Sequence, residues 1–205
     1  QMVYISRKDV DEMDKIYRIN LINSCTGYKS ANLIGTKSSK GILNVAVFSS
    51  ITHMGSNPPL LGFVIRPITV NRDTYLNIKE TGKFTVNHIH QSIIADAHHT
   101  SANYDSEISE FDQTDLEPEF LNGFEAPYVK GAPVRLGCTF LNEYPILEND
   151  TRLVIAEISE IHFNEGIQIA DGSLQLDKAE TVAINGLDGY ALPKLLERFE
   201  YAKPK

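Results

Sequence analysis

Residues 44–84 decide the fold of this chain, and they read NVAVFSSITHMGSNPPLLGFVIRPITVNRDTYLNIKETGKF. The hydroxyl-rich segment 42–50 predicts the second strand of a hairpin, and the Ser-Asn-Pro-Pro sequence that follows predicts a turn. Residues 60–66 are apolar on both faces, which predicts a buried central strand that stops at Pro67. The stretch therefore predicts two consecutive strands, which are followed by a helix.

An amphipathic helix is predicted to follow at 73–81. Residues suited to cap its two ends are Asn71 or Asp73 at the start and Gly82 at the end. A helix start carries free N–H groups and a partial positive charge, so it binds anions such as phosphate. Arg72 adds a bidentate donor and Thr74 a hydroxyl. A plain helix cap beside a solvated arginine is the alternative interpretation.

The hydroxyl groups of Ser49, Ser50 and Thr52 follow Asn44 and Ala46 along the first strand. Small side chains let a flat ring approach the backbone, whose polar groups then hydrogen-bond the edge of that ring. Outward, solvated hydroxyl groups are the alternative. The sequence thus favours a flat, polar-edged ligand that carries a phosphate.

Arg66 ends an otherwise apolar strand, so it either faces a ligand at the rim or forms a structural salt bridge. The chain has a net charge of −8, which argues against nucleic acid or an anionic membrane as the main partner. An anionic ligand would therefore need a local cationic pocket. The lysines and arginines between Lys37 and Lys83 are candidates to supply one.

Strands dominate the rest of the chain. They are predicted at 32–36, 84–89, 134–142 and 153–163, with a short edge segment at 166–177. Helices are predicted at 9–17, at 91–97 and in the last third of 187–201, while 18–24 is either helix or strand. The acidic residues 103–133 predict a long loop or lid. We therefore expect one mainly β domain over 1–205: a barrel core at about 32–190 with peripheral helices and helical extensions at both ends.

The two cysteines, Cys25 and Cys138, lie far apart and outside any metal-binding spacing. Two free, partly buried thiols are expected, as in a reducing cytoplasm. We recognise no signal peptide and no apolar run long enough to span a bilayer.

Four histidines occur between residues 88 and 99: His88, His90, His98 and His99. No cysteine or carboxylate completes a metal-ligand spacing with them, so no metal site is expected. The better functional interpretation is that one of these histidines packs over a bound ring. The alternative is that they are ordinary surface histidines. The sequence also lacks a G-x-S-x-G nucleophile, a P-loop and a G-x-G-x-x-G fingerprint.

Taken together, these residues resemble the flavin reductase-like, FMN-binding split-barrel family, and most closely its flavoredoxin-like branch. The matching segments are Gly41 with Asn44–Ala46, Phe48–Ser50, Asn57–Leu61, Arg66–Pro67, Arg72–Thr74, Asn77–Ile78, Thr81–Asn87 and Ala97–Ala102. The resemblance implies a homodimer of six-stranded, Greek-key-like split barrels with FMN near the dimer interface.

The resemblance also assigns residues to the cofactor. Residues expected to line its isoalloxazine ring are Asn44, Ala46, Phe48, Ser49, Ser50 and Ile51. Those expected at the ribityl and phosphate end are Arg72, Asp73, Thr74 and Asn77. His98 and Ser101 would lie near the open face of the ring, from the same or the other subunit. No catalytic side chain is expected, because the chemistry belongs to the cofactor.

The sequence is compatible with three functions. An NAD(P)H:flavin oxidoreductase would take hydride from NADH or NADPH and pass reduced flavin to a monooxygenase. An FMN-binding electron carrier would use the same residues and dock a cationic redox partner on its acidic surface. A protein of this fold that has lost flavin would bind another ligand.

Overall fold

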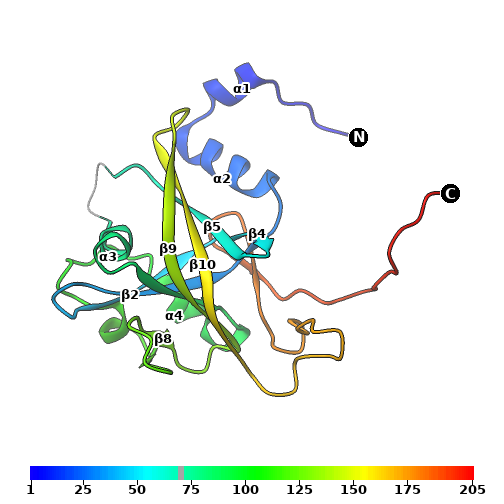
Figure 1. The fold of residues 1–205 in the computed structure, drawn as a ribbon. Helices are drawn as coiled ribbons and strands as arrows, with labels where there is room; N and C mark the ends of the chain where they lie inside the picture. The colour runs from blue at the N-terminus through cyan, green and yellow to red at the C-terminus, as the bar shows by residue number, and fades with distance from the viewer. Residues whose placement is uncertain (69–71) are drawn as a thin grey trace.

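The computed structural model describes residues 1–68 and 72–205 (Figure 1). The helices are α1 Arg7–Glu12, α2 Lys15–Cys25, α3 Asp73–Thr81 and α4 Ile94–His99, with 3-10 turns at Gln91–Ile93 and Glu110–Gln113. The strands are β1 Lys29–Ser30, β2 Asn32–Lys37, β3 Leu43–Phe48, β4 Thr52–Ser56, β5 Pro59–Ile65, β6 Lys83–His88, β7 Pro118–Glu119, β8 Tyr128–Val129, β9 Val134–Ile146, β10 Thr151–Phe163, β11 Ala183–Asn185 and β12 Gly189–Ala191.

One antiparallel sheet dominates the molecule, with strand order β3-β2-β6-β9-β10-β5-β4. The mainly β class with peripheral helices is therefore confirmed. The sheet has seven strands where six were expected, because the short strand β4 pairs with β5 immediately after the turn. The predicted buried strand is β5, which lies between β10 and β4 and has apolar residues on both faces.

The hydroxyl of Ser50 joins the two ends of this sheet. It accepts a hydrogen bond from the backbone N–H of Val64 on β5 at 3.0 Å. Strand β4 pairs with β5 only from Ser56 to Thr52, so the Ser50 side chain continues that pairing where the strand has ended. The end of β3 is in this way held against β5, and the sheet curves into a barrel.

The barrel interior is filled by apolar side chains from α3 and from the strands. Phe63 lies at its centre, with Phe48 and Phe84 each at a ring-centroid distance of 5.5 Å in edge-to-face geometry. A second core lies under α4 and the C-terminal strands, where Leu33 and Val45 are fully buried. Strands β2 and β3 therefore have buried residues on both faces, which fixes the position of β3 beside the helices.

The predicted helix at 73–81 is confirmed, and Gly82 ends it in the left-handed conformation with φ 71°. Arg72 is the N-cap residue and Asp73 the first helical residue, so the prediction that Asp73 caps the helix is wrong. Asn71 lies outside the described residues.

The outcome for the other predicted segments and for the two cysteines is as follows. The N-terminal region forms two helices, α1 and α2, so 18–24 is helical. The loop 103–133 contains only short elements, as predicted, and 166–177 contributes a single bridge between Gln168 and Leu174. Both cysteines are free, but Cys25 is exposed and only Cys138 is buried.

The predicted C-terminal helix is wrong, because 192–205 has no regular structure. A helix this short is marginal in water unless its apolar face packs on something. Leu195, Leu196 and Phe199, which would form that face, are exposed.

Candidate functional site

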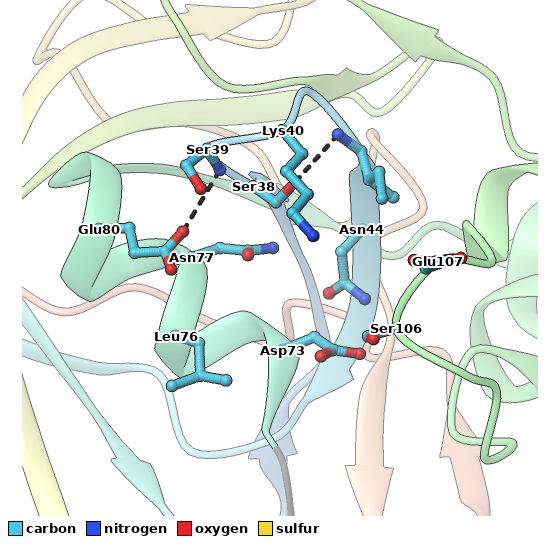
Figure 2. Close-up of a pocket in the computed structure, with 11 residues that line it drawn as sticks. Ser38, Ser39, Lys40, Asn44, Asp73, Leu76, Asn77, Glu80, Ser106 and Glu107 are labelled. Carbon is cyan, nitrogen blue, oxygen red and sulfur yellow. Dashed lines mark hydrogen bonds between the residues drawn. The ribbon is translucent and has the colours of Figure 1, made fainter.

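A cleft of about 180 Å³ lies between the β2–β3 turn, α3 and the loop around residue 106 (Figure 2). Three of its lining residues were predicted to serve the ligand: Asn44, Asp73 and Asn77. Lys40 belongs to the lysines and arginines expected to supply a cationic pocket. The remaining lining residues were not predicted: Ser38, Ser39, Ile42, Leu76, Glu80, Ser106 and Glu107. The cleft therefore brings together residues that were predicted on the strand, such as Asn44, and on the helix, such as Asp73.

A buried hydrogen-bond network forms one wall of this cleft. The Asn44 amide donates to both carboxylate oxygens of Glu110, at 2.8 and 2.9 Å. The Thr74 hydroxyl donates to the Asn44 side-chain oxygen at 3.1 Å. Asn77, one turn further along α3, donates to the hydroxyl of Thr36 on β2 at 3.0 Å. These contacts fix the start of α3 against β2 and β3.

Two side chains cover the outer edge of β3, which is the last strand of the sheet on that side within residues 1–68 and 72–205. The backbone N–H of Val45 donates to Glu110 at 3.2 Å, and that of Val47 donates to the Thr100 hydroxyl at 3.0 Å. Glu110 comes from the acidic loop and Thr100 from the end of α4. The loop is therefore attached to the strand predicted to carry the ring.

Burial raises the pKa of the Glu110 carboxyl, and the nearby negative charge of Asp73 raises it further. Burial also raises the pKa of Asp73. Glu110 was not predicted for the site, because it lies in a segment predicted to be a long loop or lid. The one local signal is its position between Ser109, which caps a 3-10 turn, and the buried Phe111.

Of the basic residues expected to form a cationic pocket, Lys40 lines the cleft and Arg72 directly precedes the lining residue Asp73. Figure 2 shows the Lys40 side chain reaching from the turn into the cleft. Arg72 is half-buried at the start of α3, where its Nε donates to the Pro67 carbonyl at 3.4 Å. Other lysines of this region bind elsewhere: Lys79 pairs with Glu143 at 2.7 Å and Lys83 donates to Thr139 at 2.8 Å.

Strand β3 and the three residues that follow it carry the remaining residues predicted for the ring. Ala46 and Ser49 are half-buried, so part of each stays accessible. Phe48 and Ile51 pack against the barrel core. Ser50 is bonded to β5, as described above, so its hydroxyl has a structural partner.

Arg66, His98 and Ser101 are predicted residues that lie neither in the cleft lining nor on β3 or α3. Arg66 is exposed beyond the end of β5, and it forms no ion pair with any residue in 1–68 or 72–205. On α4, the His98 Nδ1 lies 3.0 Å from the Tyr190 hydroxyl of β12. The Ser101 hydroxyl donates to the His98 carbonyl at 2.7 Å. The structure thus groups His98 with Ser101 but separates both from the cleft residues.

No group of metal-ligating side chains occurs within the described residues. Burial lowers the pKa of His88 to about 4, so its ring is neutral at physiological pH. Among the helices in the described part of the chain, none is long and apolar enough to cross a membrane.

The fold and sequence are similar to those of known proteins. A split-barrel protein assigned as a flavin reductase from Shewanella frigidimarina NCIMB 400 superimposes with a TM-score of 0.95 and 40% identity, over 98% of this chain and 100% of that one. The uncharacterized protein YwrF of Bacillus subtilis (strain 168) is 32% identical over 184 residues, 83% of this chain and 85% of YwrF.

More distant relatives share the fold alone. Flavoredoxin of Desulfovibrio vulgaris (Miyazaki F) superimposes with a TM-score of 0.74 at 19% identity, over 85% of this chain and 92% of that one. The sequence model of the flavin reductase like domain matches residues 28–175, which include every residue predicted for the site. This chain belongs to the flavin reductase-like family.

Proposed function

We propose that this protein is an FMN-binding oxidoreductase that transfers hydride from NADH or NADPH to flavin. The observation that carries the proposal is the family match over residues 28–175, joined to 40% identity with a protein assigned as a flavin reductase. FMN would supply the hydride-accepting chemistry when bound. A homodimer and a monooxygenase that uses the reduced flavin belong to the same proposal.

The residues at the start of α3 fit a phosphate group. Among the described residues no side chain caps this helix, so its first N–H groups remain available. Arg72 stands beside them, and the Lys40 ammonium reaches into the adjacent cleft. Asp73, Glu80 and Glu107 also line the cleft, so the phosphate would bind at the helix start rather than deep among these carboxylates.

The residues of β3 fit a flat ring. Ala46 is small and half-buried, which leaves room for close approach to the backbone. Asn44 is committed to Glu110 and Thr74, so it positions this wall instead of donating to a ligand. These contacts hold the helix start and the strand at a fixed separation, which is what a cofactor with a phosphate at one end and a ring at the other requires.

An electron carrier without nicotinamide turnover is the second candidate. The observation that favours it is the acidic loop, whose Glu110 is bonded to the edge of β3 and buried there. A loop in this position leaves less room for a nicotinamide beside the strand. The net charge of −8 would suit docking of a cationic redox partner.

A visible absorption spectrum of the purified protein separates these functions, repeated after anaerobic addition of NADH or NADPH. Flavin bands that bleach with nicotinamide are expected for the reductase. Bands that persist with both nicotinamides would contradict it and favour the carrier. A colourless protein that FMN does not stabilise would contradict both.

A further inference from the structure

Both ends of the chain leave large apolar side chains in water. Helices α1 and α2 bury none of their residues, and before them Met2, Val3 and Tyr4 are 99%, 87% and 86% exposed. In the C-terminal segment Phe199 and Tyr201 are 82% and 93% exposed. We call residues 1–25 and 192–205 the terminal arms; their two ends lie on the same side of the molecule (Figure 1).

The C-terminal arm contacts the body of its own chain through an exposed ion pair. The Arg198 Nη2 lies 2.8 Å from the Asp171 carboxylate, and both side chains are about half exposed. Its apolar neighbours Leu196 and Phe199 are not covered by this contact. Monomeric proteins seldom expose contiguous apolar patches larger than a few hundred Å². Another surface is therefore needed to cover the arm.

We propose that the terminal arms of one copy pack against a second copy of this chain, and that this exchange holds the dimer together. The proposal rests on the homodimer of the proposed function and names the segments that form it. Tyr4, Phe199 and Tyr201 are nearly fully exposed, and aromatic side chains bury roughly 150–250 Å² each, so three of them provide on the order of 500 Å² per copy. Met2 and Leu196 bring the arms close to the roughly 800 Å² per partner of a stable interface.

Two features favour a second copy over an unrelated protein. In a twofold dimer the same surface serves both partners, so two arms that reach to the same side are covered reciprocally. The C-terminal arm also begins directly after β12, whose Tyr190 hydroxyl lies 3.0 Å from the His98 ring. A partner held by the arm is thus brought beside α4, where the family resemblance places the open face of the flavin.

Sedimentation velocity of the full chain at rising concentration tests the proposal. We expect the wild type to sediment at twice the 22.9 kDa of one chain. The double variant Leu196→Asp/Phe199→Asp should weaken the dimer by about tenfold or more, because buried apolar anchors carry most of the binding energy. Leu147→Asp, which changes an 80% exposed leucine in the β9–β10 turn, is the matched control and should leave the dimer unchanged.

Chymotrypsin cleavage within the arms provides a second measurement, in which the wild-type dimer is protected and the double variant is cut rapidly. A monomeric wild type, a double variant that dimerises normally, or an equal loss for Leu147→Asp would each overturn the proposal. Circular dichroism of the double variant should match the wild type, because Leu196 and Phe199 are 88% and 82% exposed in their own chain. FMN titration is scored separately: a dimer that depends on the arms yet binds no FMN would support this inference and contradict the proposed function.

Discussion

Glu110 is the residue on which the wall of the candidate site depends. It is 7% exposed and accepts hydrogen bonds from Asn44 and from the backbone of Val45. Burial and the charge of Asp73 raise its pKa in the folded protein, so the native state binds this proton more tightly than the unfolded chain does. The contribution of Glu110 to stability is therefore largest at low pH and declines as the pH rises above the unfolded value of about 4.3.

Urea denaturation at a series of pH values checks the direction of this pH dependence. From about pH 4 to about pH 8, the free energy of unfolding of the wild type should fall relative to that of Glu110→Gln, which cannot ionise. The exposed Glu148→Gln is the control and should track the wild type across the series. A difference between wild type and Glu110→Gln that stays constant with pH would contradict the raised pKa.

Arg72 tests the phosphate end of the proposed FMN site. Replacing Arg72 with Ala should weaken FMN binding by about 1–3 kcal/mol, because a charge-assisted hydrogen bond to phosphate is lost. Riboflavin has no phosphate, so its affinity should change much less. Titration of flavin fluorescence measures both, with Lys130→Ala at an exposed position outside the terminal arms as the control. Equal losses for the two flavins would show that Arg72 has only a structural role.

Among the strands, β2 allows an unusually close approach by the acidic loop. A Cβ at Gly35 would lie 2.1 Å from the Pro127 carbonyl oxygen and 2.5 Å from the Thr85 hydroxyl, which donates to that oxygen. The loop thus packs directly on the backbone of β2 because Gly35 has no side chain. This contact anchors the segment that also delivers Glu110 to β3.

Gly35→Ala should therefore destabilise the protein by about 1–3 kcal/mol or more, the typical result of overpacking. Gly41→Ala is the control, because its Cβ would meet nothing within 4 Å although its φ is 85°. The control should cost only about 1 kcal/mol of backbone strain. Thermal unfolding of both variants measures the difference, and equal losses would argue against the steric contact.

The sequence predicted correctly those elements whose ends and apolar faces are determined by neighbouring residues. The double-sided apolar run of β5 and the cap at Gly82 identified their elements with nearly correct ends. The helix predicted at the C-terminus is wrong for the opposite reason: the sequence has a helical pattern, but the apolar residues of that face, Leu195, Leu196 and Phe199, are exposed. Periodicity reports which face is apolar and not whether a partner for it exists.

The candidate site was predicted in part. Asn44 and Thr74 are hydrogen-bonded although β4 and β5 separate their strand and helix along the chain, and it was the family resemblance, not a local pattern, that assigned them to one cofactor. Glu110 lies 66 residues from Asn44 along the chain, and no local pattern predicts such a pairing. Ser50 was assigned to the ring, yet its hydroxyl bonds to β5, a contact that depends on the curvature of the whole sheet.

On the scale of the whole molecule, ligand binding and stability are linked. If the folded protein binds FMN and the unfolded chain does not, FMN at about a hundred times its dissociation constant should stabilise the protein by about 2.7 kcal/mol. A thermal-shift series with FMN measures this, and inorganic phosphate at the same concentration is the control. A melting temperature that does not change with FMN would contradict flavin binding.

The covered edge of β3 has a consequence for solubility. An unpaired edge strand is a template on which strands of other chains assemble into aggregates and fibrils. Here the outward N–H groups of Val45 and Val47 are already bonded to the side chains of Glu110 and Thr100. The same two side chains that hold the loop and α4 on the sheet therefore also keep this edge from starting cross-β polymerisation.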